Sequence, residues 1–164
     1  MLAFGGHLSR GILLVDTNRK WLDALRDGLS LIGIGQAELC TDFQCARKQL
    51  RNAPPEVLIT NLRLGAYNGL HLVMLALSAE LPVRCLTYGT QSNPTDMALA
   101  REGQKAGAFF EPSYRLPHAL PAYLRTSLPN HDRRDLASVD RRLTFRGGRR
   151  RTDAVEVRFS PGWS

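Results

Sequence analysis

The 164-residue sequence lacks long hydrophobic runs and has few cysteines. Its apolar stretches, such as Ile12–Val15, are far too short for a membrane-spanning helix, which needs about 20 apolar residues. The opening Met1–Gly6 has no basic segment followed by an apolar one, so a secretory signal is not expected. These absences predict a cytoplasmic protein that makes no contact with a membrane.

The three cysteines, Cys40, Cys45 and Cys85, form no CxxC pair. An odd number of cysteines in a cytoplasmic chain predicts reduced thiols that serve packing. The four histidines are scattered, and no group of histidine and cysteine has the spacing of a zinc site. Motifs of common enzymes are also missing, namely a GxxxxGK[ST] loop, a helix-opening GxGxxG and a GxSxG elbow. The sequence therefore predicts a protein that is not an enzyme.

Positive charge is in excess and is concentrated near the C-terminal end. The formal net charge is +7. Residues 1–128 contain 13 Lys and Arg against 10 Asp and Glu, whereas residues 129–164 contain 9 against 5. The second segment has arginine runs and no sustained apolar period, which predicts a basic, disordered tail. Because such charge attracts phosphate backbones, nucleic-acid binding through this tail is an alternative function.

Short apolar runs alternate with amphipathic patterns along the rest of the chain. Predicted strands lie at 11–15, 37–41, 57–60, 82–87 and 107–111. Predicted helices lie at 18–32, 42–52, 70–79, 93–106 and 113–128, with Pro117 and Pro121 in the first turns of the last one. Five strand–helix repeats with continuous apolar strands predict an α/β three-layer sandwich around a five-stranded parallel sheet. This domain spans residues 10–128 and follows a short extension, residues 1–9.

Ligand chemistry in parallel α/β sheets lies at the carboxyl ends of the strands. Those ends are occupied here by four polar or turn-forming segments. They are Asp16-Thr17, Asn61, Thr87 and the stretch around Pro112. The sequence therefore predicts that any functional site is built from these residues.

The same segments resemble the receiver domains of bacterial two-component response regulators, over about residues 10–128. Five motifs in the family's order carry the resemblance: Ile12–Asp16, Pro55–Leu64, Asn68–Leu70, Pro82–Thr87 and Ala106–Phe110. The resemblance implies a flavodoxin-like (βα)5 fold. It also implies a role in phosphorelay signal transduction.

The family's chemistry requires an acceptor aspartate, two further acidic residues that hold Mg²⁺, a Thr or Ser hydroxyl and a lysine. Here the acceptor position is Asn61, and a neutral carboxamide is a poor nucleophile. The metal-site positions are Asp16 and Thr17, so one carboxylate of three remains and Mg²⁺ binding is expected to be weak or absent. Thr87 is retained, whereas the lysine position falls near Pro112. Asp16 is left as a weak residual metal candidate, and no cofactor or catalytic residue is expected.

The departures predict a degenerate pseudo-receiver that acts through protein–protein contacts. The expected function is that of an atypical single-domain response regulator whose partner is a histidine kinase, another response regulator or a second copy. Tyr88, next to Thr87, is expected to cover the mouth of the pocket. The expected partner face follows the family's fourth helix, fifth strand and fifth helix. Its residues are Met97, Arg101, Lys105, Phe109, Tyr114 and Tyr123.

Overall fold

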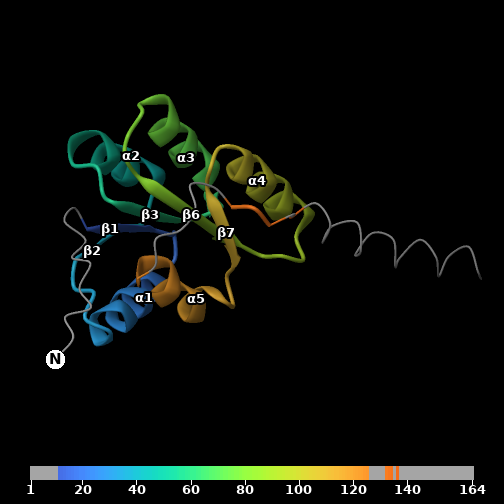
Figure 1. The fold of residues 1–164 in the computed structure, drawn as a ribbon. Coiled ribbons are helices and arrows are strands. Elements are labelled where there is room, and N and C mark those ends of the chain that lie inside the picture. The colour runs from blue at the N-terminus through green and yellow to red at the C-terminus, as the bar shows by residue number, and fades with distance from the viewer. Residues whose placement is uncertain (1–10, 126–131, 135, 137–164) are drawn as a thin grey trace, which may run out of the picture. The chain divides into compact units, whose positions relative to one another are not determined.

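The computed structural model describes residues 11–125, 132–134 and 136. Within them, five parallel strands form one sheet in the order β2-β1-β3-β6-β7, and two short strands form a separate hairpin (Figure 1). The sheet strands are β1 (Ile12–Val15), β2 (Ala37–Cys40), β3 (Val57–Asn61), β6 (Arg84–Gly89) and β7 (Phe109–Pro112). The predicted (βα)5 sandwich with a parallel sheet is confirmed.

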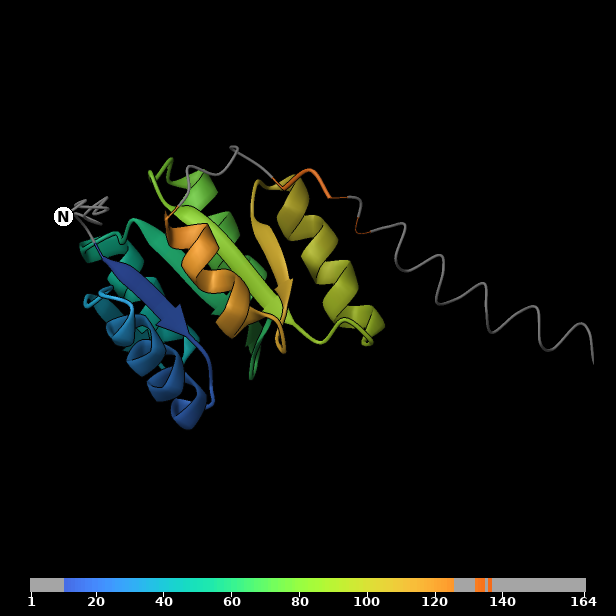
Figure 2. The ribbon, with the colours of Figure 1, turned by 60° about the horizontal axis from the view of Figure 1, so that its bottom comes forward.

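Five helices cover the two faces of this sheet. One face carries α1 (Arg19–Leu31) and α5 (Leu116–Arg125), and the other carries α2 (Phe43–Asn52), α3 (Gly69–Ser78) and α4 (Pro94–Lys105) (Figures 1 and 2). The central strands are buried on both sides, which explains why their sequences are continuously apolar. Even-numbered residues of β1 and odd-numbered residues of β3 thus serve one core, and odd-numbered residues of β1 and even-numbered residues of β3 serve the other.

Four of the five helices begin at an Asn or Asp whose side chain accepts a hydrogen bond from a backbone N–H of the first turn. These residues are Asn18, Asp42, Asn68 and Asn93. Each satisfies a donor that the helix itself leaves without a partner. The caps therefore explain why the helices start close to the predicted positions.

Two local predictions are wrong. No strand was predicted between residue 60 and the helix at 70–79, yet β4 (Arg63–Leu64) pairs antiparallel with β5 (Tyr67–Asn68). Gly65 supplies the left-handed backbone of the turn, with φ of 68°. Pro121 was expected in the first turns of the last helix, but it lies inside α5, which runs from Leu116 to Arg125.

The prediction of three reduced cysteines is also wrong. A disulfide joins Cys40 to Cys45, whose Cα atoms are 5.6 Å apart. Cys40 ends β2 and Cys45 lies in the first turn of α2, so a short connection brings the two side chains together. Cys85 is a free thiol. Burial raises its pKa to about 12, so the thiol is protonated at neutral pH and a poor nucleophile.

Contacts of the domain continue past the predicted boundary at residue 128. The carboxylate of Asp132 accepts a hydrogen bond from the backbone N–H of Phe110, and its carbonyl accepts one from the Gln104 side chain. Because β7 is an edge strand, Asp132 caps a donor that no neighbouring strand could satisfy.

Most of the predicted tail, and the predicted extension 1–9, lie outside the described residues. Among the residues that are described, none belongs to a helix long and apolar enough to cross a membrane.

Candidate functional site

Three polar side chains meet at the carboxyl end of the sheet, on the three neighbouring strands β1, β3 and β6. Asp16 follows β1, Asn61 ends β3, and Tyr88 lies near the end of β6. The register places Val15 beside Thr60 and Asn61 beside Tyr88. Because register partners of a parallel sheet point to the same face, Asn61 and Tyr88 project together toward the Asp16 carboxylate.

The Asp16 carboxylate accepts three hydrogen bonds. Its Oδ2 accepts one from the Tyr88 hydroxyl at 2.6 Å and one from the Asn61 amide nitrogen at 2.9 Å. Its Oδ1 accepts one from the backbone N–H of Asn18 at 2.8 Å. Hydrogen bonds to a carboxylate are stronger than those between neutral groups. Three neutral donors can therefore stabilise the buried Asp16 carboxylate without a cation.

Tyr88 is the largest side chain of this cluster and is only 1% exposed. Burial raises the pKa of Tyr88 far above its ordinary value. The negative charge of Asp16 and the hydrogen bond to it raise this pKa further, whereas a hydrogen bond with Trp21 lowers it. The phenol is therefore a fixed donor at any physiological pH. It fills the space beside Asp16 and does not lie at the surface as a cover.

Both ends of the Asn61 amide are used. Nδ2 donates to Asp16, and Oδ1 accepts a hydrogen bond from the backbone N–H of Arg63 at 2.9 Å. The backbone N–H donor of Arg63 selects the orientation of the amide, so that its nitrogen and not its oxygen faces the carboxylate. An aspartate at this position would instead face Asp16 with a second negative charge.

Thr17, Thr87 and Pro112 make no part of this cluster. Thr17 is exposed, and the buried Thr87 hydroxyl donates to the carbonyl of Phe109 on β7 at 3.2 Å. Pro112 is buried beside Gly89, and the carboxylate of its neighbour Glu111 accepts a hydrogen bond from the Tyr123 hydroxyl. The structure thus brings Asp16 and Asn61 together and adds Tyr88. The alignment of β3 with β6 could have identified Tyr88, because it is the register partner of Asn61.

A second polar contact lies beside the first and was not foreseen from the sequence. Asp96, on the first turn of α4, is 2% exposed, and its Oδ1 accepts a hydrogen bond from Nε of Arg63 at 2.6 Å. Its Oδ2 accepts one from the backbone N–H of Thr90 at 2.8 Å. The pair links the segment after β3 to the loop between β6 and α4. Local sequence patterns could not predict this ion pair, because Arg63 and Asp96 are 33 residues apart.

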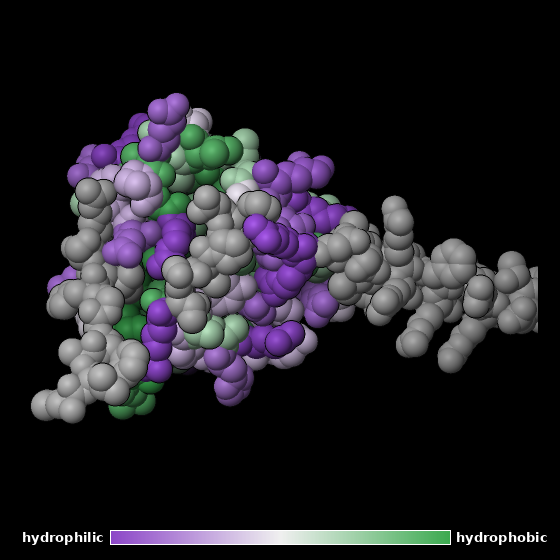
Figure 3. Space-filling model, in the orientation of Figure 1, coloured by the Kyte–Doolittle hydropathy of each residue, from purple (hydrophilic) through white to green (hydrophobic). Residues whose placement is uncertain are grey.

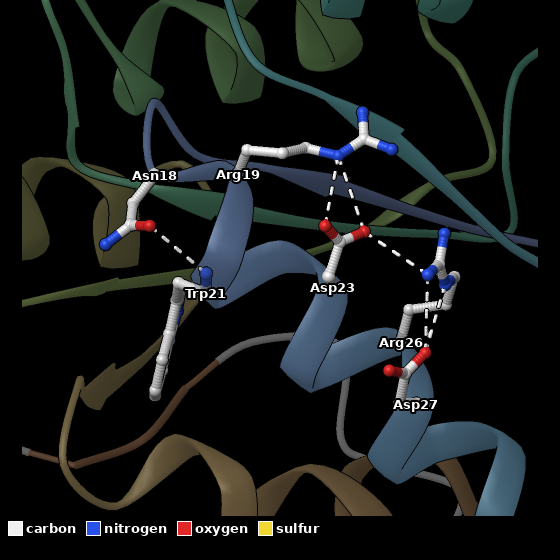
Figure 4. A network of polar contacts seen from close by, with 6 residues as sticks. All are labelled: Asn18, Arg19, Trp21, Asp23, Arg26 and Asp27. Carbon is white, nitrogen blue, oxygen red and sulfur yellow. Dashed lines mark hydrogen bonds and ion pairs between the residues drawn. The ribbon is translucent and has the colours of Figure 1, made fainter.

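Replacing Asp96 with alanine is expected to lower the free energy of unfolding by about 2–3 kcal/mol, because two hydrogen bonds to a buried charge are lost. Asp23 of α1 is the matched control. It pairs with Arg19 and Arg26 on the helix surface, where Figure 4 shows the three side chains in contact. Asp23→Ala should cost less than about 1 kcal/mol, since exposed ion pairs contribute little. Equal losses in urea unfolding would contradict the importance of the buried contact.

The residues of the predicted partner face are not all on the surface. Tyr114 is exposed, Lys105 pairs with Glu102, and Arg101 is half-buried. The half-buried Phe109 packs edge-on against Tyr123 with ring centroids 5.5 Å apart. Met97 is buried in the core between α4 and the sheet, so its assignment to this face is wrong. On α4 it lies one residue after the buried Asp96 and three before the buried Ala100, which places it on the inner side of the helix.

Comparison with solved structures identifies the architecture. The chain superimposes on a response regulator receiver domain protein (CheY-like) from Methanospirillum hungatei with a TM-score of 0.61 and 16% identity, covering 71% of this chain and 90% of that one. For the signal receiver domain of NarL from Mycobacterium tuberculosis the TM-score is 0.58, with 18% identity and coverage of 71% and 96%. For full-length FixJ from B. japonicum it is 0.62, with 22% identity and coverage of 71% and 56%. The chain has the receiver fold. No family model and no curated protein matches the sequence.

The pocket of this receiver fold does not fit a divalent cation. Among the described residues, no group of three or more His, Cys, Asp or Glu side chains could hold a metal ion. Asp16 is the single carboxylate of the cluster, and both of its oxygens already accept hydrogen bonds. Mg²⁺ prefers negative oxygen ligands in an octahedral arrangement, and the neutral donors of Tyr88 and Asn61 occupy that space.

Proposed function

We propose that the chain is an atypical response regulator of two-component signalling that works without an aspartyl phosphate, acts through protein contacts and catalyses no reaction. The observation that carries the proposal is the hydrogen bond from the Asn61 amide to Asp16. It puts a neutral donor where phosphoryl transfer to a receiver would need an ionised nucleophile. The receiver fold supports the wider assignment to signalling.

The electrostatics of the cluster support the same conclusion. In a receiver with several carboxylates, like charges crowd one site and repel, and a metal or a phosphoryl group relieves the repulsion. Here one negative charge meets three donors, so no repulsion remains to be relieved. The pocket therefore favours a single state that needs no ligand, and a population shift would require a ligand that prefers some other state.

The packing around Tyr88 supports a permanently closed pocket. A phosphoryl group bound at Asn61 would have to displace the buried phenol, whose hydroxyl lies 2.6 Å from Asp16. Displacement would leave the Asp16 charge without its shortest hydrogen bond in a buried place, which is costly. Output then depends on the surface that the fixed fold presents to other proteins.

A direct test is incubation with acetyl phosphate and Mg²⁺, followed by intact-protein mass spectrometry under conditions that preserve acyl phosphates. We expect no phosphorylated species, whereas a receiver domain with its acceptor aspartate, treated in parallel, should be labelled. A phosphorylated fraction that disappears in Asn61→Ala would overturn the proposal. Labelling that persists in Asn61→Ala would overturn it as well, because another acceptor would then exist.

A further inference from the structure

We propose that the outer face of α3, with the hairpin that precedes it, is a docking surface for an acidic amphipathic segment of a partner protein. We call this the α3 surface and define it as Tyr67, His71, Met74 and Leu77. The inference rests on the proposed function, since it names the kind of protein contact through which such a regulator acts. The surface is on α3, which lies between α2 and α4 (Figure 1), and it includes no residue of the predicted partner face on α4, β7 and α5.

The composition of α3 sets it apart from the other helices. Of the five helices in the described part of the chain, α3 alone has no Lys, Arg, Asp or Glu. A helix at the surface of a soluble domain normally turns charged residues toward solvent. Here the inner face is apolar, with Leu72, Val73 and Ala76 buried, and the outer face is largely apolar as well.

The exposed side chains form one line along the helix. His71, Met74 and Leu77 are spaced three residues apart, so they lie on one side of α3. Met74 is 46% exposed and Leu77 is 52% exposed. Figure 3 shows hydrophobic residues gathered over α3 in the upper part of the view. Clustered exposed apolar side chains of this kind mark interaction sites more often than scattered ones.

Aromatic rings extend the line at the start of the helix. Phe43 of α2 stacks on Tyr67 of β5 with ring centroids 4.3 Å apart, and His71 packs edge-on against both. This packing holds the half-exposed Tyr67 ring in place next to α3. A rigid aromatic side chain loses little conformational freedom on binding, which suits it to anchor a partner.

The charge beside the surface selects the partner. The neighbouring α2 carries Arg47, Lys48 and Arg51 and no acidic residue. Within the described residues, none of the three forms an ion pair. A second copy docked symmetrically on α3 would bring two such basic helices together, and like charges repel. An amphipathic segment with apolar residues on one side and acidic residues at its edges complements both features.

The test uses the full chain and a labelled synthetic helix of about 20 residues, with leucines on one face and glutamates elsewhere. Fluorescence anisotropy should show saturable binding that weakens as salt is added. The double variant Met74→Glu, Leu77→Glu should weaken binding by about tenfold or more, because it adds negative charge and removes the apolar contact. Leu31→Glu is the matched control, since Leu31 is 89% exposed on α1, away from the α3 surface, and should bind as the wild type does.

The remaining arms make the outcome decisive. A peptide with lysines in place of the glutamates should bind much more weakly, and equal binding of the two peptides would overturn the assignment of an acidic partner. Unchanged binding by the α3 double variant, or no binding by the wild type, would overturn the surface itself.

Sedimentation velocity tests whether a second copy of the chain occupies the α3 surface instead. A dimer that the double variant dissociates would show that a second copy binds there and would overturn the assignment of an acidic partner. Circular dichroism melts check that the variant is folded. The phosphorylation test does not involve α3, so either proposal can fail alone.

Discussion

Replacing Gly69 with alanine is expected to lower the free energy of unfolding by about 3 kcal/mol or more, which corresponds to roughly 10–15 °C in melting temperature. A Cβ at this position would lie 2.3 Å from the carbonyl oxygen of Asn61 and 2.9 Å from two side-chain atoms of Thr60. Both neighbours belong to the buried strand β3, so neither can move aside cheaply. The glycine lets α3 begin directly against the strand that carries the pocket.

Gly28→Ala is the control for this change. Gly28 lies within α1, and a Cβ there would meet no atom within 4 Å. Alanine is the better helix former, so this variant should gain about 0.5–1 kcal/mol. Thermal melts of the two variants therefore should shift in opposite directions. A Gly69→Ala protein as stable as the wild type would show that α3 can move away from β3 at little cost.

Replacing Tyr88 with alanine is expected to cost about 4 kcal/mol or more, because a fully buried ring is lost and a cavity remains beside the sheet. Tyr88→Phe separates the two contributions. It keeps the ring and removes only the hydroxyl that donates to Asp16, so we expect a loss of about 1.5–3 kcal/mol. Urea unfolding at neutral pH measures both, and Tyr114→Phe, at an exposed tyrosine, should leave stability unchanged.

The raised pKa of Tyr88 also predicts a dependence of stability on alkaline pH. The unfolded chain ionises this phenol at its ordinary pKa of about 10, whereas the folded chain keeps it neutral. The stabilisation is therefore fully present below pH 10 and is lost as pH rises above it, by up to about 1.4 kcal/mol per pH unit. Tyr88→Phe should lack this component. Parallel pH profiles for wild type and variant above pH 10 would contradict the burial of an unionised phenol.

These stability effects bear on the proposal that the pocket does not switch between two states. Gly69, Asn61 and Tyr88 hold one another in place around Asp16, through a close backbone approach and two hydrogen bonds. These contacts support the proposal that the pocket has a single arrangement. The protein is therefore expected to present a constant surface to its partners, in contrast to a receiver that alternates between two states.

Much of the architecture was predictable because it depends on local patterns. Continuous apolar runs such as Ile12–Val15 indicate strands buried on both faces, and capping residues such as Asn18 and Asn93 mark where helices start. Departures arose where local preference competes with long-range packing. Pro121 is tolerated inside α5, and Tyr67 of the short hairpin packs on Phe43 of α2, a contact that local propensity does not reveal.

By itself, the sequence determined the receiver-like order of strands and helices, the carboxamide at position 61 and the shortage of carboxylates around it, since these depend on residue identity and periodicity. Only the tertiary structure decided which hydroxyl reaches Asp16. Thr87 and Tyr88 are adjacent in β6, but successive side chains of a strand point to opposite faces, so the register with β3 sends Tyr88 to the pocket and Thr87 toward β7. The pairing of Arg63 with Asp96, 33 residues apart, was likewise set by packing between segments, which no local pattern encodes.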